Sequence, residues 1–342
     1  IKKQIQAVSE MYTQLQSEVV NPEEVHAIHK KMNNLFSPMI SEILANARKM
    51  LFATIGDKSE ARESIVTWIE QIEQLGDKRY HTHLYSESPK SALKVPVIPA
   101  IITEKSPRLN GFEVLNKCFD KALKRLPEMF AFGEDVGHIG DVNQGFAGLQ
   151  EKYGIERVFD AGIREWSIMG QAIGMSMRGL RPIAEIQYLD YLIYGLEPLT
   201  DDLATMRWRS NNLQQAPAII RTRGHRLEGV WHAGSPMGMI INSLRGMYVL
   251  TPRNMTQAAG FYNTLLQSDD PAIVIECLNG YRLKEALPDN VGKFTVPLGV
   301  PEILQVGTDV TLVTYGSCVR IAQAGMAQLE KHNVSVESVS YT

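Results

Sequence analysis

The chain has few cysteines, no long apolar run and little net charge, and each of these absences excludes a class of protein. Its three cysteines, Cys118, Cys277 and Cys318, lie far apart in 342 residues. They form neither a disulfide framework nor a zinc-ligand spacing, and they indicate reduced, buried thiols in a cytosolic-type compartment. No apolar run approaches the ~18 residues of a membrane span. A net charge of −3 gives no reason to expect a nucleic acid or an anionic membrane as partner.

The first 76 residues carry only helical signals. Asn21-Pro22 places a capping residue before a proline at the first helical position. SEARESIVTWIEQIEQLG is an amphipathic segment, and we expect its helix to end at Gly76. Residues 77–108 have four prolines and no periodicity, which predicts an extended linker. The chain starts at Ile1 and stops within a strand-like pattern, so we expect a piece of a longer protein whose ends say nothing of targeting.

From residue 109 the pattern changes to alternating helices and strands. Predicted strands such as MFAFGEDV, PIAEIQY, APAIIRTRG and PAIVIEC alternate with helical segments up to about residue 280. This alternation predicts a parallel sheet covered by helices on both faces, in which functional groups gather where strands end. Residues 281–307 are a proline-bearing connector, and residues 308–342 begin a second α/β unit.

One predicted helix begins at Glu165 and is rich in glycine. From Met169 to Leu180 nearly every residue is apolar or small, and Gly170 and Gly174 stand four apart on one face. We expect an interior helix that packs closely against other backbone on all sides. A glutamate in the first turn of such a helix is either a partner of the helix dipole, which is the commoner case, or a placed acid.

Several polar residues follow the predicted strands. Glu134 closes the first strand, Gln187, Tyr188 and Tyr191 close the strand PIAEIQY, and His232 lies in a loop after the strand APAIIRTRG. Taken singly, each has an ordinary structural explanation: a strand-end cap, an aromatic residue with a polar tip, or a histidine bonded to backbone. The loop GHIGDVNQG lacks both the Walker spacing and the dinucleotide fingerprint, so we interpret it as a turn.

Five segments give the chain a family resemblance by their order and spacing. They are GEDVG, IREWSIMGQAIGMSMRGLRPIAEIQYLDY, WHAGSP, VLTPRN and DVTLVTYGS. With them, residues 108–342 resemble the beta subunit of thiamine diphosphate-dependent 2-oxo acid dehydrogenases, the decarboxylating first component of the pyruvate and branched-chain complexes. The resemblance implies a transketolase-type pyrimidine-binding domain over 109–280 and the start of a transketolase C-terminal α/β domain over 308–342.

The resemblance also implies roles for single residues. In the family, the carboxylate at the position of Glu165 bonds to the aminopyrimidine ring of thiamine diphosphate, and His232 falls on the active-site histidine. We expect both to be catalytic, and Glu165 also to bind the cofactor. The other residues expected to bind the cofactor are Ile163, Gln187, Tyr191 and Glu134.

The magnesium site of the family has no counterpart in the sequence. Family members hold the diphosphate through Mg²⁺ with a Gly-Asp-Gly motif and a downstream asparagine, and no Gly-Asp-Gly occurs here. Since Mg²⁺ needs hard oxygen ligands, we expect them on an alpha-type half, either a separate chain or a missing fused part. Residues 24–51 resemble, more weakly, the helical tail of the alpha subunit, as an alpha–beta fusion would require. A homo- or hetero-oligomer follows from either arrangement.

The resemblance implies that the intact enzyme oxidatively decarboxylates a 2-oxo acid and reductively acylates a lipoyl domain of the acyltransferase component, in a multienzyme complex. IQYLDY is closer to the branched-chain type, so we expect 3-methyl-2-oxobutanoate, from branched-chain amino acid catabolism, with pyruvate as the alternative. We expect the fragment alone to be inactive. A bacterial-type cytoplasm is the expected compartment, and the mitochondrial matrix is the alternative.

Two other functions compete with this one. A transketolase or deoxyxylulose-phosphate synthase relative would share the domain pair, and the loop RTRGHR could then supply basic residues for a sugar phosphate. A non-catalytic assembly subunit would keep the fold without the chemistry. The joint presence of Glu165, Tyr191 and His232 argues against the assembly subunit.

Overall fold

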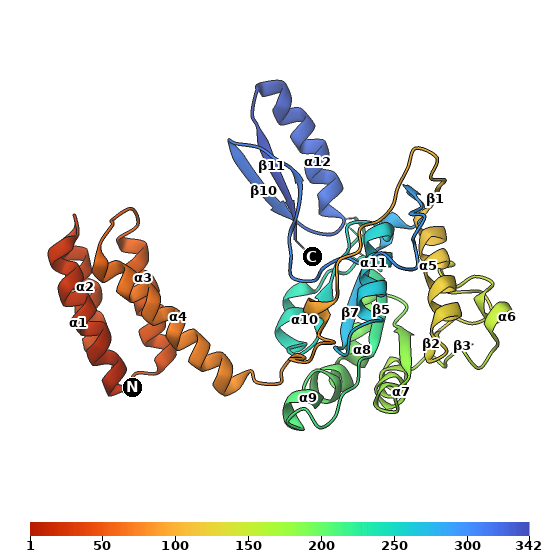
Figure 1. Cartoon of the computed structure of the whole chain (residues 1–342), viewed down its shortest axis with the longest axis horizontal. Helices are drawn as coiled ribbons and strands as arrows, with labels where there is room; N and C mark the ends of the chain where they lie inside the picture. Colours follow the sequence, from red (N-terminus) through yellow and green to blue (C-terminus); the bar gives the residue numbers. More distant parts are fainter. Residues whose placement is uncertain (227, 231, 342) are drawn as a thin grey trace. The chain divides into compact units, whose positions relative to one another are not determined.

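The computed structural model describes residues 1–226, 228–230 and 232–341, and it divides into two compact units, residues 1–82 and 83–342. Figure 1 colours the chain along its sequence. None of the helices in these described residues is both long enough and apolar enough to cross a membrane. The first unit is made of helices α1 (Lys2–Glu18), α2 (Pro22–Asn33), α3 (Ile40–Ala53) and α4 (Glu60–Tyr80).

The four helices of the first unit share one apolar core. Side chains such as Val8, Ile43 and Ile65 are fully buried in it. Helix α2 begins at Pro22, as the sequence predicts. The predicted end of the last helix at Gly76 is wrong, because α4 continues to Tyr80. A glycine inside a helix costs only ~1 kcal/mol relative to alanine, and the basic residues of the last turn favour the negative end of the helix dipole.

The second unit is built on a six-stranded sheet in the order β3-β2-β4-β5-β7-β6. All of its neighbouring strands run parallel, which confirms the predicted α/β fold. The strands are β2 (Met129–Gly133), β3 (Val158–Asp160), β4 (Arg181–Glu185), β5 (Ile219–Gly224), β6 (Tyr248–Leu250) and β7 (Ala272–Cys277).

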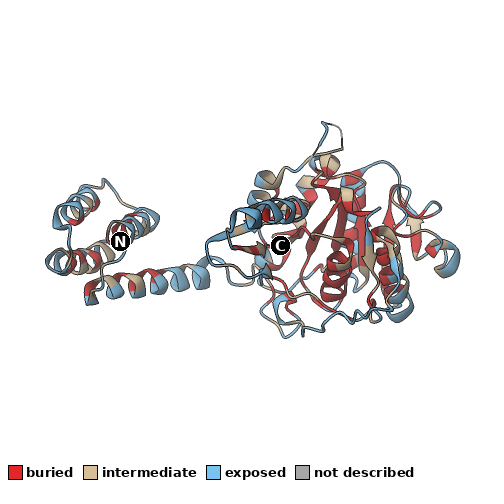
Figure 2. Cartoon of the chain, turned by 90° about the horizontal axis from the view of Figure 1, so that it is seen from above, coloured by how far each residue is buried: buried red, intermediate tan, exposed pale blue. Residues whose placement is uncertain are grey.

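Helices cover both faces of this sheet. Helices α5 (Gly111–Arg125) and α11 (Met255–Leu265) share one apolar cluster with the strands, and α7 (Glu165–Met177), α8 (Leu192–Glu197) and α10 (Met237–Ser243) share the other. Successive strand residues therefore alternate between the clusters: Ile219 lies in the first and Ile220 in the second. Figure 2 shows the strands as buried and the outer sides of the covering helices as exposed.

Shorter helices connect these elements. The segment 192–209 is divided into α8, a π-helical stretch (Pro198–Leu203) and α9 (Met206–Arg209). The remaining short helices are α6 (Leu149–Tyr153) and the 3-10 turns Ala92–Lys94, Leu189–Tyr191, Leu278–Gly280 and Glu330–His332. The loop 137–145, expected as a turn, has no helix or strand.

The C-terminal part forms a small sheet of its own. Strands β9 (Glu302–Gln305), β10 (Val310–Thr314) and β11 (Val336–Ser340) lie in the order β10-β11-β9, and α12 (Cys318–Leu329) connects the parallel pair β10 and β11. Residues 281–307, expected as a proline-bearing connector, carry β9 and also β8 (Lys284–Ala286). The latter pairs antiparallel with β1 (Arg108–Asn110).

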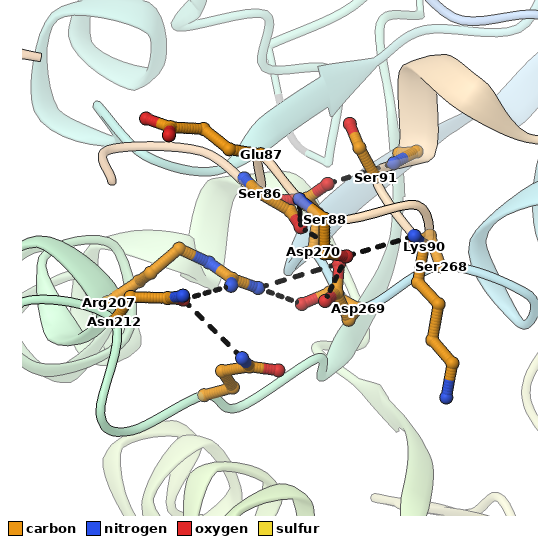
Figure 3. Close-up of polar contacts among 12 residues, drawn as sticks. Ser86, Glu87, Ser88, Lys90, Ser91, Arg207, Asn212, Ser268, Asp269 and Asp270 are labelled. Carbon is orange, nitrogen blue, oxygen red and sulfur yellow. Dashed lines mark hydrogen bonds and ion pairs between the residues drawn. The ribbon is translucent and has the colours of Figure 1, made fainter. Parts of the chain in front are cut away.

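The extended segment before β1 is fastened to the α/β unit. Figure 3 shows two neighbouring aspartates, Asp269 and Asp270, at the centre of these contacts. The carboxylate of Asp270 accepts hydrogen bonds from the backbone N–H of Ser86 at 2.7 Å and of Ala92 at 2.9 Å. Asp269 accepts from the Ser88 hydroxyl at 2.9 Å. Residues 77–80 of the expected linker thus belong to α4, and residues 86–92 are held by buried and half-buried carboxylates.

Candidate active site at the strand ends

Glu165 is the first residue of α7 and is 9% exposed. The side of α7 that carries Ile168, Met169 and Ala172 packs against the sheet. The prediction that α7 is buried on all sides is wrong for this chain, because Gly170 and Gly174 are exposed and a Cβ atom added at either would meet nothing within 4 Å. The exposed side of α7 carries glycine, serine and glutamine together with the apolar side chains of Trp166 and Met177.

A second carboxyl group, that of Glu134, lies beside Glu165 at the end of β2. Glu134 is 8% exposed. Burial raises the pKa of Glu134, and the neighbouring carboxylates of Glu165 and Asp135 raise it further. Its Oε1 atom is buried and accepts no hydrogen bond from any residue that the structure describes. The site therefore has a buried acceptor that a ligand with an N–H group could satisfy.

Tyr191 and His232 form a hydrogen-bonded pair. A bond of 2.7 Å joins the Tyr191 hydroxyl and Nε2 of His232, and the rings meet edge to face at 5.4 Å and 82°. The ring of Tyr188 stacks on His232 at 3.9 Å and 8°. Burial raises the pKa of the Tyr191 hydroxyl, as do Tyr188 and Glu134 close by. The structure thus brings together four residues predicted separately from the sequence, Glu134, Glu165, Tyr191 and His232.

The loop that carries His232 is held at Gly234 by two hydrogen bonds. The Asp190 carboxylate accepts a hydrogen bond from the Gly234 N–H at 3.1 Å, and the His225 N–H donates to the Gly234 carbonyl at 3.1 Å. A Cβ atom at Gly234 would lie 2.5 Å from Oδ1 of Asp190, so the contact needs glycine. The backbone of His232 itself has a φ of 55°, a value that residues other than glycine rarely adopt.

The two remaining predicted residues lie farther toward solvent. Gln187 donates a hydrogen bond from Nε2 to Oδ2 of Asp135 at 3.0 Å. Ile163 is 72% exposed, and so this chain alone does not enclose it. Next to Glu165, Trp166 is also exposed and donates from its indole N–H to Glu197 at 2.7 Å. The site is therefore open on the side of Ile163 and Trp166.

Behind the site lies a buried charge network that sequence reasoning missed. Arg221 donates to Asp141 at 2.6 Å and to Glu276 at 2.8 Å, and Arg223 lies 3.4 Å from Asp141. Both arginines also contact Glu185. The side chains of all five residues are completely buried. A signal was present: the pattern Arg-Thr-Arg puts charges at alternate positions of an otherwise apolar strand.

The network sets unusual protonation behaviour for its members. Burial alone would raise the pKa of Asp141, but Arg221 and Arg223 hold it below its ordinary value. Burial raises the pKa of Glu185 to about 7, because the attraction of the two arginines only partly opposes the loss of water. Glu185 is therefore a buried carboxyl group that titrates near neutral pH.

These arginines cannot serve the sugar-phosphate function considered from the sequence. Arg221 and Arg223 are inaccessible and already paired with carboxylates. The third arginine of RTRGHR, Arg226, is partly exposed and lies 3.4 Å from Glu228. Arg221 and Arg223 are thus unable to bind a phosphate group, and the charge of Arg226 is partly neutralised by Glu228.

Comparisons with known proteins show which family the chain is similar to. The family model "Transketolase, pyrimidine binding domain" matches residues 109–283. The pyruvate dehydrogenase E1 component subunit beta of Acholeplasma laidlawii is 34% identical over 229 residues, which are 66% of this chain and 69% of that protein. The 2-oxoisovalerate dehydrogenase subunit beta of Bacillus subtilis is 31% identical over 233 residues, 68% of this chain and 71% of that protein.

The chain belongs to the family of 2-oxo acid dehydrogenase beta subunits. This family is thiamine diphosphate-dependent. Among solved structures, a split-gene transketolase in an inactive beta4 tetramer resembles this beta-subunit chain with a TM-score of 0.55 at 18% identity. That match covers 68% of this chain and 70% of the other, and it shows a shared fold.

The beta-subunit site fits the pyrimidine end of thiamine diphosphate. The aminopyrimidine ring offers an amino group and ring nitrogens. The chain supplies two adjacent buried carboxyl groups, one of which has an oxygen without a donor among the described residues. The exposed side near Ile163 and Trp166 leaves room for a second protein surface to complete the pocket.

Proposed function

We propose that this chain is the pyrimidine-binding half of the decarboxylating component of a 2-oxo acid dehydrogenase. The observation that carries the proposal is the convergence of Glu165, Glu134, Tyr191 and His232 at the carboxyl ends of parallel strands, where α/β proteins place their ligands. Membership in the beta-subunit family supports it.

The bound cofactor would supply a nucleophilic carbon that adds to the carbonyl carbon of the 2-oxo acid. It would also stabilise the negative charge left when CO₂ departs. Glu165 holds and returns the proton at the pyrimidine ring nitrogen. Burial and the nearby carboxylates of Glu165 and Asp135 raise the pKa of Glu134, so this carboxyl group binds a proton more readily than a free glutamate does. The hydrogen bond from Tyr191 fixes the orientation of the His232 ring. His232 would then hold the substrate carboxylate or deliver a proton during transfer to the lipoyl group.

We propose a branched-chain substrate, 3-methyl-2-oxobutanoate, on the strength of the IQYLDY segment. Pyruvate is the second candidate, since relatives of both kinds match this chain at similar identity. The two acids differ in the volume of the side chain that the pocket must enclose, and this volume depends partly on the alpha-type half.

The same proposal includes the partners. An alpha-type half would supply the Mg²⁺ ligands for the diphosphate, and a lipoyl domain of the acyltransferase component would accept the acyl group. The compartment would be a bacterial-type cytoplasm, with the mitochondrial matrix as the alternative.

The test is an assay of the intact parent protein with an artificial electron acceptor. Turnover of 3-methyl-2-oxobutanoate above pyruvate is the expected result, and the reverse order would assign the pyruvate type. Ketol transfer with sugar phosphates, without oxidation of any 2-oxo acid, would contradict the proposal and indicate a transketolase. Cofactor binding without any turnover would indicate an assembly subunit.

A further inference from the structure

We propose that Tyr188 is a positioning residue for His232 and that the buried cation of Arg223 anchors it. The expected effect on turnover rests on the proposed function. The expected positions of the Tyr188, His232 and Arg223 side chains do not depend on it. Tyr188 comes directly before the turn Leu189–Tyr191, so it lies between the end of β4 and the residue that bonds to His232.

The first step of the argument is the contact between the two rings. Tyr188 and His232 stack at a centroid distance of 3.9 Å with only 8° between their planes. Tyr191 meets the same imidazole from its edge and bonds to its Nε2 atom at 2.7 Å. The stacking fixes the plane of the imidazole, and the hydrogen bond fixes its rotation within that plane.

The second step is the support of Tyr188 from the protein interior. The guanidinium carbon of Arg223 lies 5.8 Å from the centroid of the Tyr188 ring, within cation–π range. Arg223 is itself held by Glu185 and Asp141, and none of these three side chains is exposed. Tyr188 therefore contacts both a rigid part of the sheet and a histidine on a loop.

The third step is the need for such support. His232 lies on a loop with an unusual backbone conformation, and a loop side chain loses rotational freedom when it is fixed. Displacement of a reacting group by about 1 Å can cost ~10²-fold in rate. Loss of the stacking ring should therefore lower turnover, although Tyr188 need not touch a reacting atom.

The test compares Tyr188→Leu with Tyr188→Phe in the intact parent. The leucine variant should lower kcat ~10-fold or more with little change in thiamine diphosphate affinity, and the phenylalanine variant, which keeps the ring, should restore most of kcat. Tyr153→Leu is the matched control, since Tyr153 is a half-buried tyrosine bonded to Asp120 away from the site. It should leave kcat unchanged.

A second readout needs no turnover. In the 342-residue chain, the ring-proton NMR signals of His232 should shift downfield in Tyr188→Leu, because the ring current of the stacked tyrosine is lost, and should stay near their wild-type positions in Tyr188→Phe and Tyr153→Leu. Unchanged signals in a folded Tyr188→Leu chain would refute the inference. Shifted signals together with an inactive wild-type parent would instead refute only the proposed function.

Discussion

Glu165 and Glu134 are two buried acids that lie close together. Their proximity is stronger evidence for a ligand site than either residue is alone. Acids at helix starts are common because of the dipole, and Glu165 by itself is compatible with that role. The buried Glu134 beside it, with a raised pKa and an oxygen lacking a donor among the described residues, is difficult to explain by the dipole. At the scale of the residue, a pair of acids placed to bind a ligand with N–H groups is the better explanation.

Glu165→Gln should abolish most decarboxylation in the intact parent while the fold is kept. The amide has the shape of the acid but cannot exchange a proton with the ring, and steps of this kind contribute ~10²–10⁴-fold. Turnover and circular dichroism measure the two effects, with the exposed Glu156→Gln as control. Near-wild-type turnover would return Glu165 to the dipole role.

His232→Ala should lower turnover by about 10²-fold while thiamine diphosphate affinity stays close to normal. The reason is that His232 bonds to Tyr191 and stacks on Tyr188, whereas we propose that the two acids bind the pyrimidine. Kinetics and a cofactor titration separate the two quantities, and the exposed His138→Ala is the control. A large loss of cofactor affinity would indicate a structural histidine instead.

At the scale of the element, the sheet contains a carboxyl group that titrates near neutral pH. Burial raises the pKa of Glu185 from 4.5 to about 7, so the folded state binds this proton more tightly than the unfolded state. The stability gained from the proton is complete below about 4.5 and is lost as pH rises to about 7.

Glu185→Gln removes this titration. The free energy of unfolding of the wild type, minus that of the variant, should fall as pH rises through this window and level off above it. Urea unfolding at several pH values measures this difference. Glu302→Gln, which removes a partly exposed partner of Arg253, should give a difference without that slope. A constant difference for Glu185→Gln would contradict the assigned protonation.

Periodicity in the sequence was enough to predict the strands of the sheet, because buried parallel strands are short apolar runs between helices. It was insufficient for two features. Helix α7 lacks charge on its outer side, so its glycine face could not be distinguished from a buried one. The network of Arg221 and Arg223 depends on three carboxylates from distant parts of the chain, and no local pattern indicates which pairs will form.

The candidate site was predicted from the resemblance rather than from periodicity. Glu134, Glu165, Tyr191 and His232 were each weak signals, since they lie on different loops and strand ends. The 2.7 Å bond between Tyr191 and His232 and the stacking of Tyr188 required the fold, because 41 residues separate the bonded pair. Asp190 was likewise missed, since its contact with Gly234 joins two loops.

At the scale of the whole molecule, we propose that this chain supplies one half of a split site. The chain carries the acids for the pyrimidine, is open beside Ile163 and Trp166, and contains no Gly-Asp-Gly sequence for a diphosphate-bound Mg²⁺. A few hydrogen bonds at about 1 kcal/mol net each are too little to offset the entropy of association. A complementary alpha-type half would complete the site, and the cofactor would then stabilise both parts by linkage.

Calorimetric titration of thiamine diphosphate with Mg²⁺ tests this central claim most directly. The 342-residue chain alone should give no tight binding, and addition of the alpha-type half should create a Mg²⁺-dependent site that Glu165→Gln weakens. Tight, Mg²⁺-dependent binding to the chain alone as a monomer would contradict the account, since one chain would then carry both halves of the site.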